Sequence, residues 1–293
     1  MHGTGPPLVT PFDAEGALDE PALRELVGWV EARGVDFLVP CGSNSEAELM
    51  TAAERARTVE VVADEASVPV LAGTGSPGLA ETLEATAAAA DAGADAALVV
   101  TPFYYGHSMA TLEEYYTEVA DAAEIPVYLY SVPAYTDVKL DPDTVATLAE
   151  HPNIGGMKDS SGDIQTFQRT QRRVADLDFD LMVGSGGVLA QALAAGGSGG
   201  VLALANVAPE ATTAVYEAHE AGDHERAREL TAACVELNYA VTGGHSVPGL
   251  KYAMRERGAP AGHVRSPHRP ADEAARAALD DLLAEFEALR GDL

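Results

Sequence analysis

Lysine is almost absent from this chain of 293 residues. It occurs at three positions, Lys139, Lys158 and Lys251, so that 15 of the 18 basic residues are arginines. Lys158 ends an apolar stretch within the segment 154–162, where small and polar residues follow. A primary amine can form an imine with a carbonyl substrate, whereas a guanidinium stays protonated. Lys158 therefore indicates either imine chemistry or an ordinary ion pair with Asp159 or Asp163.

Cysteine is equally scarce, and long apolar runs are missing. Cys41 and Cys234 are the only cysteines, which argues against a disulfide framework and fits a reducing compartment. No apolar run reaches the ~20 residues that span a bilayer, and the chain begins without a signal-peptide pattern. The eight histidines do not gather with carboxylates at the predicted strand ends, so we expect no metal. We expect a cytoplasmic protein that does not enter the membrane.

Positive charge is the third shortage. The formal net charge is −28 because 46 acids oppose the 18 basic residues. Such a balance argues against nucleic acid and anionic membranes as partners. The acids are spread through the predicted helices, and 47% of the residues are hydrophobic, so the chain is expected to fold. This acidity predicts a halophilic protein, because at ~1 M salt the Debye length falls to about 3 Å and self-repulsion is screened.

What the sequence does contain is a regular alternation of strands and helices. Eight short apolar segments are expected as parallel strands covered on both faces: 7–10, 36–40, 69–73, 96–101, 126–130, 154–157, 180–183 and 200–204. Helices are expected at 19–33, 51–66, 78–92, 110–123, 141–150, 163–176, 187–195 and 208–221. Eight such units indicate a (β/α)8 TIM barrel. An open doubly wound sheet fits less well, because no Gly-x-Gly-x-x-Gly turn follows the first strand.

The strand pattern stops near residue 222. Three further helices are expected at 223–242, 246–257 and 271–290, separated by Gly243-Gly244 and a proline-rich region at 259–270. We therefore expect a catalytic barrel over residues 1–221 and a C-terminal helical extension over residues 222–293.

Polar and aromatic residues follow the predicted strands, where barrel enzymes build their active sites. Six short motifs lie there in order: 8–12 (Leu-Val-Thr-Pro-Phe), 42–46 (Gly-Ser-Asn-Ser-Glu), 101–104 (Thr-Pro-Phe-Tyr), 128–133 (Tyr-Leu-Tyr-Ser-Val-Pro), 156–162 (Gly-Met-Lys-Asp-Ser-Ser-Gly) and 204–209 (Leu-Ala-Asn-Val-Ala-Pro). With these motifs the chain resembles, over essentially its full length, the dihydrodipicolinate synthase / N-acetylneuraminate lyase family. Members of that family are class I pyruvate aldolases, which form a Schiff base with a lysine.

The resemblance implies a role for each matching residue. Lys158 would condense with the keto carbon of pyruvate or its adduct, without any cofactor. Tyr130 would transfer protons, although an aromatic that merely fills the barrel top is the alternative. Ser43 and Asn44 would hold the pyruvyl carboxylate. Asn44 replaces a hydroxyl residue and cannot relay a proton, and Ser45 replaces the usual glycine, which leaves the loop geometry open.

Other positions carry weaker implications. Tyr104 matches a tyrosine that enters a neighbouring subunit's site, which implies a homotetramer built as a dimer of dimers. Its alternative role is an aromatic packed within its own subunit. Ser185 and Gly186 would offer backbone N–H groups to a carboxylate. The backbone carbonyl of Leu202 would face the substrate.

The residue at position 135 bears on the choice of substrate. Synthases of the lysine precursor generally carry an arginine two residues after the proline that matches Pro133, and this chain has Tyr135 there. The sequence therefore favours cleavage of 2-keto-3-deoxygluconate, its 6-phosphate or both, as in the Entner–Doudoroff routes of salt-adapted archaea. His107 lies near the place where phosphate-accepting relatives carry an arginine. The alternatives are 4-hydroxy-tetrahydrodipicolinate synthase and an inactive barrel that serves as a binding protein.

Overall fold

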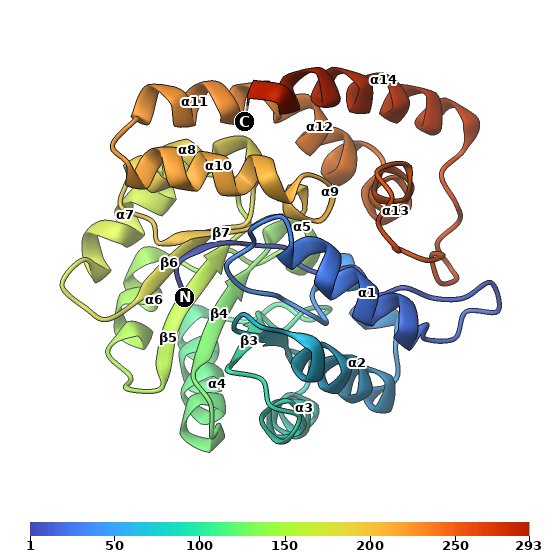
Figure 1. Cartoon of the computed structure of the whole chain (residues 1–293). Coiled ribbons are helices and arrows are strands. Elements are labelled where there is room, and N and C mark those ends of the chain that lie inside the picture. The colour runs from blue at the N-terminus through green and yellow to red at the C-terminus, as the bar shows by residue number, and fades with distance from the viewer. Residues whose placement is uncertain (293) are drawn as a thin grey trace.

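The computed structural model describes residues 1–292 and shows a curled parallel sheet surrounded by helices (Figure 1). Its strands are β1 (Gly3–Gly5), β2 (Leu71–Gly73), β3 (Ala96–Val100), β4 (Val127–Ser131), β5 (Ile154–Asp159), β6 (Asp180–Val183) and β7 (Gly199–Val201). The order is β1-β7-β6-β5-β4-β3-β2, and every pairing is parallel. This is the predicted TIM-barrel fold.

The segment 36–40 closes the barrel between the two edge strands. Leu38 forms a parallel bridge with Val70. On the other side, the Asp36 N–H donates to the Thr4 carbonyl at 2.9 Å. These contacts complete the circle, although the segment itself forms only an isolated bridge. The predicted strand at 36–40, the second in chain order, is therefore present only as a short, irregular segment.

The predicted ends of some strands were wrong. The first strand lies at Gly3–Gly5, before the predicted segment 7–10. Pro6 and Pro7 explain the difference, because proline has no N–H to donate to a ladder. Glycine suits β1, since a Cβ on Gly5 would lie 2.5 Å from the Phe37 carbonyl oxygen. The last strand ends at Val201, and β5 continues to Asp159, so that Lys158 lies within a strand.

The helices of the barrel lie close to their predicted positions. They are α1 (Glu20–Glu31), α2 (Ala52–Glu65), α3 (Leu79–Asp91), α4 (Met109–Ala122), α6 (Pro142–Ala149), α7 (Ile164–Val174), α8 (Leu189–Ala194) and α10 (Pro209–Glu220). Their starts follow local capping signals: the Asp19 side chain accepts from the Ala22 N–H, and Thr51 and Glu54 form a capping box. Two short helices, α5 (Pro133–Thr136) and α9 (Leu204–Val207), were not predicted.

The barrel interior is filled by inward-pointing side chains of the strands. They include Phe37, Val39, Leu71, Leu98, Tyr128, Tyr130, Met182 and Val201. Tyr128 lies toward the N-terminal end of the strands, where its hydroxyl donates to Asp180 at 2.6 Å. Tyr130, two residues later, faces inward at the opposite end, as the period of two in a strand requires. The same alternation thus places one tyrosine in the core and the other at the barrel mouth.

The C-terminal extension consists of α11 (His224–Ala233), α12 (Val235–Tyr239), a π-helical turn (Ala240–Gly244), α13 (Ser246–Glu256), α14 (Glu273–Leu289) and a 3₁₀ turn (Arg290–Asp292). The single helix predicted over 223–242 was wrong, because the chain breaks at Cys234 and ends in the π-helical turn at Gly244. Figure 1 shows α11, α12 and α14 beyond α8 and α10, and α13 beside α9. Leu250, Met254 and Leu279 share a hydrophobic cluster with Leu8 and Phe12.

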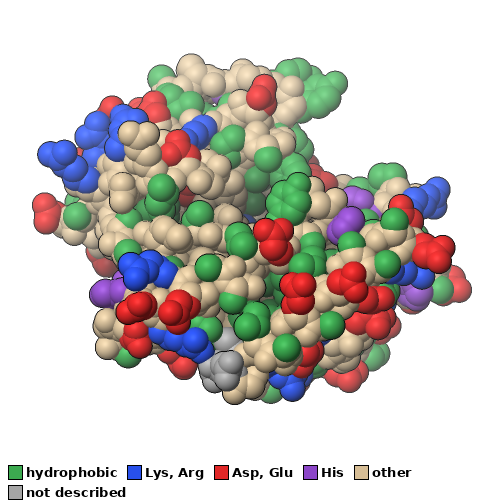
Figure 2. All heavy atoms as spheres, turned by 90° about the horizontal axis from the view of Figure 1, so that it is seen from above, with side chains coloured by type: hydrophobic (Ala, Val, Ile, Leu, Met, Phe, Trp, Pro, Cys, Tyr) green, Lys and Arg blue, Asp and Glu red, His purple; other side chains and the backbone are tan. Residues whose placement is uncertain are grey.

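Ion pairs use many of the scarce cations at the surface. Arg57 binds Glu20 and Glu60, at 2.6 and 2.7 Å respectively. Figure 2 shows lysine and arginine side chains interspersed among the acidic ones on the face it presents. Exposed pairs of this kind contribute little stability each. Within residues 1–292, no helix is both long and apolar enough to cross a membrane.

Candidate active site

Lys158 and Tyr130 lie side by side, and both side chains point into the barrel. They lie on the neighbouring strands β5 and β4, and their Cα atoms are paired in the sheet register. The Lys158 side chain is buried at 3% exposure, and its Nζ atom lies 4.2 Å from the centre of the Tyr130 ring. The register of two parallel strands is thus sufficient to bring an amine and a phenol together.

The ion-pair alternative for Lys158 was wrong. Asp163 pairs instead with Lys139, whose Nζ lies 2.6 Å from the carboxylate. Asp159 follows Lys158 in the strand and so points to the opposite face, where its carboxylate accepts from the Ser161 N–H at 2.8 Å. Within the described chain, no carboxylate lies within 4.0 Å of the Lys158 amine.

The surroundings of Tyr130 favour its ionised form. Burial raises the pKa of the phenol, but the charge of Lys158 opposes it, together with hydrogen bonds from Ser43, Ser160 and Lys158. The net result is a pKa for Tyr130 below the ordinary value of tyrosine. A phenol of this kind can release and recover a proton beside the amine, which is the requirement for a general acid–base.

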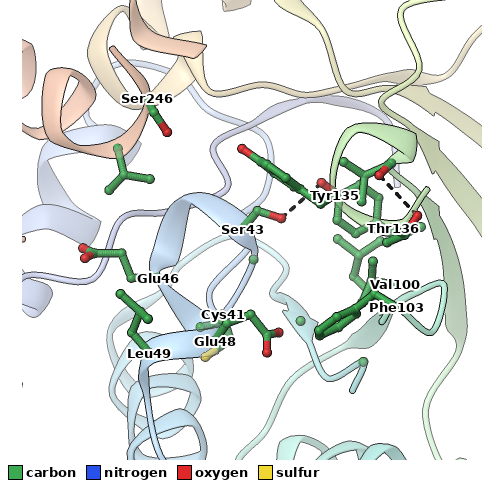
Figure 3. Close-up of a pocket in the computed structure, with 18 of the residues that line it drawn as sticks. Cys41, Ser43, Glu46, Glu48, Leu49, Val100, Phe103, Tyr135, Thr136 and Ser246 are labelled. Atoms are coloured by element: carbon green, nitrogen blue, oxygen red, sulfur yellow. Dashed lines mark hydrogen bonds between the residues drawn. The ribbon is translucent and has the colours of Figure 1, made fainter. Parts of the chain in front are cut away.

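Ser43 connects Tyr130 to the loop that follows the closing segment 36–40. It opens a 3₁₀ turn (Ser43–Ser45), and its Oγ lies 3.4 Å from the Tyr130 hydroxyl (Figure 3). Ser45 stands where the family that this chain resembles has glycine. It is buried, and its hydroxyl makes two hydrogen bonds. Its hydroxyl accepts from the Gly42 N–H at 3.0 Å and donates to the Leu8 carbonyl at 2.5 Å. The left-handed conformation falls on Glu46 instead, at φ 58°.

A cavity of about 380 Å³ opens beside Tyr130. Its walls come from the 42–49 loop, the ends of β3 and β4, α5 and the C-terminal extension; they include Ser43, Glu46, Glu48, Val100, Phe103, Tyr130, Tyr135, Ser246, Val247 and His268. Lys158 adjoins this lining through its contact with the Tyr130 ring. Among the described residues, no lysine or arginine lines the cavity. The volume suits a small organic molecule, and the walls offer hydroxyl groups and two carboxylates.

Three of the predicted site residues line this cavity, namely Ser43, Tyr130 and Tyr135. Tyr135 lies on α5 and is 67% exposed. In Figure 3 the hydroxyls of Tyr135 and Ser246 point toward one another across the cavity. The position that the sequence singled out for substrate choice is therefore at the cavity wall.

Four other predicted binding residues do not line the cavity, namely Asn44, Ser185, Gly186 and Leu202. Asn44 is half-buried beside Ser43. Ser185 and Gly186 follow β6, and Gly186 packs so closely on the extension that a Cβ there would lie 2.7 Å from Asn238 Oδ1. Leu202 is fully buried, and its carbonyl already accepts from the Ala205 N–H at 2.9 Å. A carbonyl oxygen has a second lone pair, so the role predicted for Leu202 stays a prediction.

Tyr104 and His107 lie apart from the cavity lining. Tyr104 is 87% exposed and has a φ of 79°, a conformation that costs energy for a residue with a Cβ. Its ring packs only edge-on against the exposed Tyr105, with centroids 4.9 Å apart. Tyr104 is therefore little packed within its own subunit, and its role in a neighbouring site stays a prediction.

Sequence reasoning missed several residues of the site. Ser160, which hydrogen-bonds Tyr130, could have been found, because it follows Lys158 by two positions and so points to the same side of the strand. Its side chain fills the space above Gly184, where a Cβ would lie 1.8 Å from Ser160 Oγ. No motif in the sequence indicated that Ser246, Val247 and His268 belong to the site, because the extension reaches the cavity only through the tertiary fold.

The chain is similar to known proteins over nearly its whole length. The model of the dihydrodipicolinate synthetase family matches residues 1–286. An uncharacterized DapA-like lyase of Halobacterium salinarum is 41% identical over 288 residues, which cover 98% of this chain and 94% of the relative. A 4-hydroxy-tetrahydrodipicolinate synthase of Methanothrix thermoacetophila is 38% identical over 293 residues, covering 100% and 99%.

Solved structures agree with the fold. The crystal structure of YagE, a prophage protein of the dihydrodipicolinic acid synthase family from E. coli K12 in complex with pyruvate, has a TM-score of 0.93. It is 33% identical to this chain, and the similarity covers 98% of this chain and 99% of YagE.

Proposed function

Because the chain belongs to the dihydrodipicolinate synthetase family, whose members are pyruvate-dependent lyases that use a lysine Schiff base and no cofactor, we propose that Lys158 forms the imine and that the substrate is a 2-keto-3-deoxy sugar acid. The products are pyruvate and glyceraldehyde, or glyceraldehyde 3-phosphate from the 6-phosphate. The contact between the Lys158 amine and the Tyr130 ring carries this proposal.

In the proposed reaction, the unprotonated Lys158 amine attacks the keto carbon C2 of the substrate. Tyr130 protonates the resulting hydroxyl, which leaves as water when the imine forms. The phenolate then takes the proton of the C4 hydroxyl, the C3–C4 bond breaks, and its electrons pass to the enamine. The aldehyde departs, Tyr130 returns the proton to C3, and water hydrolyses the imine to pyruvate and free Lys158, with the proton released in this step restoring the phenol. The lowered pKa of Tyr130 supports both of its steps.

The pyruvyl carboxylate is assigned to the side of the site that carries Ser43 and Asn44. The Ser43 hydroxyl can donate to the carboxylate and relay a proton to Tyr130, since the two oxygens are 3.4 Å apart. The Asn44 amide can donate but cannot relay. Ser185 and Gly186 supply further N–H donors, and the Leu202 carbonyl faces the same end.

Two features of the cavity support a sugar acid. Tyr135 stands where a carboxylate-binding arginine is expected in synthases of the lysine precursor, and no lysine or arginine of residues 1–292 lines the cavity in its place. The walls instead offer Tyr135, Ser246 and Glu48, which suit the hydroxyls of a sugar chain. For the 6-phosphate, His268 at the cavity wall is a better placed partner than His107. The pathway proposed is an Entner–Doudoroff route in a salt-rich cytoplasm.

A second candidate is 4-hydroxy-tetrahydrodipicolinate synthase. It is favoured by the names of relatives such as the Methanothrix thermoacetophila enzyme. That reaction would bring a second carboxylate, from aspartate semialdehyde, into a cavity that already holds Glu46 and Glu48. Without a cationic partner the carboxylate would lose about 1.5–3 kcal/mol of hydrogen-bond energy, roughly ten- to a hundredfold in rate.

The proposed assembly is a homotetramer arranged as a dimer of dimers. Tyr104 supports it, because an exposed tyrosine in a left-handed conformation is available to a neighbouring subunit. In the proposed assembly this side chain completes the site of its neighbour.

The test compares substrates with the full-length protein in concentrated KCl. Pyruvate release is measured from 2-keto-3-deoxygluconate, its 6-phosphate and N-acetylneuraminate, beside the condensation of pyruvate with aspartate semialdehyde. The proposal predicts the highest kcat/KM for one of the two 2-keto-3-deoxygluconate forms. The highest value for the semialdehyde would overturn it and establish the synthase. Tyr135→Arg provides a matched variant, which should raise the semialdehyde reaction relative to sugar acid cleavage.

A further inference from the structure

Lys251 is a second buried lysine close to the active site. It lies on α13 of the C-terminal extension, and its side chain is fully buried. Its Nζ atom lies 2.5 Å from the Glu46 carboxylate and donates to the carbonyls of Thr10 and His263 at 2.6 and 2.7 Å. Two carbonyls therefore accept hydrogen bonds from the ammonium group, and the Glu46 carboxylate supplies the opposite charge, which together keep the charge of Lys251 inside the protein.

Glu46, the partner of Lys251, is the residue at which the backbone of the Ser43 loop changes direction. It follows the 3₁₀ turn Ser43–Ser45 and precedes a second turn, Ala47–Leu49, in a left-handed conformation. Its other carboxylate oxygen accepts from the Arg265 N–H at 2.8 Å. A non-glycine residue keeps this backbone conformation only when its surroundings hold it there. Here the surroundings come largely from the extension, through Lys251 and Arg265.

Lys251 joins the 8–10 segment to the 42–49 loop, and these two segments also contact each other close to Ser43. The Leu8 carbonyl, two residues before Thr10, accepts from the Ser45 hydroxyl at 2.5 Å. Lys251 therefore binds the 8–10 segment through Thr10 and the 42–49 loop through Glu46. Ser43 lies at the start of the turn so fixed, 3.4 Å from the Tyr130 hydroxyl.

We propose that Lys251, through its ion pair with Glu46, is a positioning residue that holds Ser43 against Tyr130. The C-terminal extension then sets the geometry of the active site as well as contributing Ser246, Val247 and His268 to its wall. Lys251 does not line the cavity, so it acts through Glu46 and not on the substrate. This role rests on the proposed function, because it assigns proton transfer to Tyr130 and Ser43.

The test is a double-mutant cycle between Lys251 and Ser43, in the full-length protein in concentrated KCl. Lys251→Met and Ser43→Ala are made singly and together, and kcat is divided by the fraction of sites that borohydride traps with pyruvate. We expect Lys251→Met to lower this corrected kcat by up to about 100-fold, because a small displacement of a site group can cost that much. In the Ser43→Ala background the same change should cost less than about threefold.

A control and a second variant complete the design. Lys139→Met removes a partly exposed lysine paired with Asp163, and it should leave the corrected kcat unchanged. If Lys251→Met does not fold, Glu46→Gln combined with Lys251→Met avoids the unpaired buried carboxylate and should show the same loss. An unchanged corrected kcat, or equal losses with and without Ser43, would overturn the positioning role. Absence of a trapped adduct in the wild-type protein would instead contradict the proposed function.

Discussion

The three lysines of the chain occupy three different environments. Lys139 binds Asp163 at the surface, Lys251 is enclosed by Glu46 and two carbonyls, and Lys158 lies against Tyr130 with no carboxylate of residues 1–292 within 4.0 Å. Only an unprotonated amine attacks a carbonyl. The structure thus distinguishes a surface ion pair, a buried ion pair and an amine without a carboxylate partner.

Tyr130 gives the sharpest prediction at the residue scale. Tyr130→Phe should lower kcat by roughly 10²–10⁴-fold, because a positioned acid–base group contributes about that much. Imine formation with pyruvate should slow as well, since the same phenol serves both steps. Stopped-flow and steady-state assays measure the two effects, and a near-normal kcat would leave Tyr130 as a packing residue.

The pH dependence of kcat/KM follows from the direction of the Tyr130 pKa in the free enzyme. The Lys158 charge and the hydrogen bonds of the phenol outweigh its burial and lower this pKa, so the phenolate forms at a lower pH than that of free tyrosine. Because the first step needs the protonated phenol, we expect a descending limb of kcat/KM below pH ~10 that Tyr130→Phe abolishes. A limb that survives in this variant would assign the titration to another group.

At the scale of elements, the strand ends show what a sequence can and cannot specify. Tyr130 and Lys158 were predictable as site residues because apolar runs ended near them, and parallel strands end at one edge. The position of β1 was not predictable, since the run at 7–10 is as apolar as a strand and only Pro6 and Pro7 interrupt a regular ladder there. Ser246 and Lys251 could not be found, because their contacts with the barrel depend on how the extension packs.

An ion pair between the extension and α2 makes stability depend on pH. Hydrogen bonds from Arg265, and then from the Thr51 backbone, lower the pKa of Glu54 to about 2. The folded pKa is below the unfolded one, so this contribution is present above pH ~4.5 and is lost as the pH falls toward 2. Glu54→Gln should reduce the free energy of unfolding by on the order of 1–3 kcal/mol at pH 7.

The difference between wild-type and Glu54→Gln proteins should narrow as the pH falls below ~4.5. Chemical denaturation at constant KCl concentration, repeated at several pH values, measures it. A difference that stays constant down to the acid transition would mean that the pair does not link the extension to α2 energetically.

At the scale of the whole molecule, the exposed Tyr104 predicts sites shared between subunits. Lys158→Arg subunits lack the proposed nucleophile but keep Tyr104. Tyr104→Phe subunits keep Lys158 but lack the Tyr104 hydroxyl. Mixed oligomers should regain activity, because a Tyr104→Phe subunit can receive an intact Tyr104 from its neighbour. The two variants are unfolded together, refolded in concentrated KCl and assayed against each variant alone. No gain on mixing would place Tyr104 outside the neighbour's site.

The charge of the whole chain sets the conditions for these experiments. With a net charge of −28 per chain, the subunits of the proposed homotetramer would repel one another unless salt screened them. Light scattering should therefore show dissociation or unfolding as KCl is removed. An active oligomer of unchanged mass at low salt would contradict the expected halophilic behaviour.

Imine formation at Lys158 is tested most directly by reduction with borohydride in the presence of pyruvate. Lys158→Arg serves as the matched control, because arginine keeps the positive charge but cannot form the imine. We predict that the wild-type protein gains the mass of one reduced pyruvate adduct per chain, that peptide mapping places it on Lys158, and that the variant gains none and loses aldol cleavage. An adduct on Lys139 or Lys251, or a Lys158→Arg protein that still cleaves the substrate, would contradict the account.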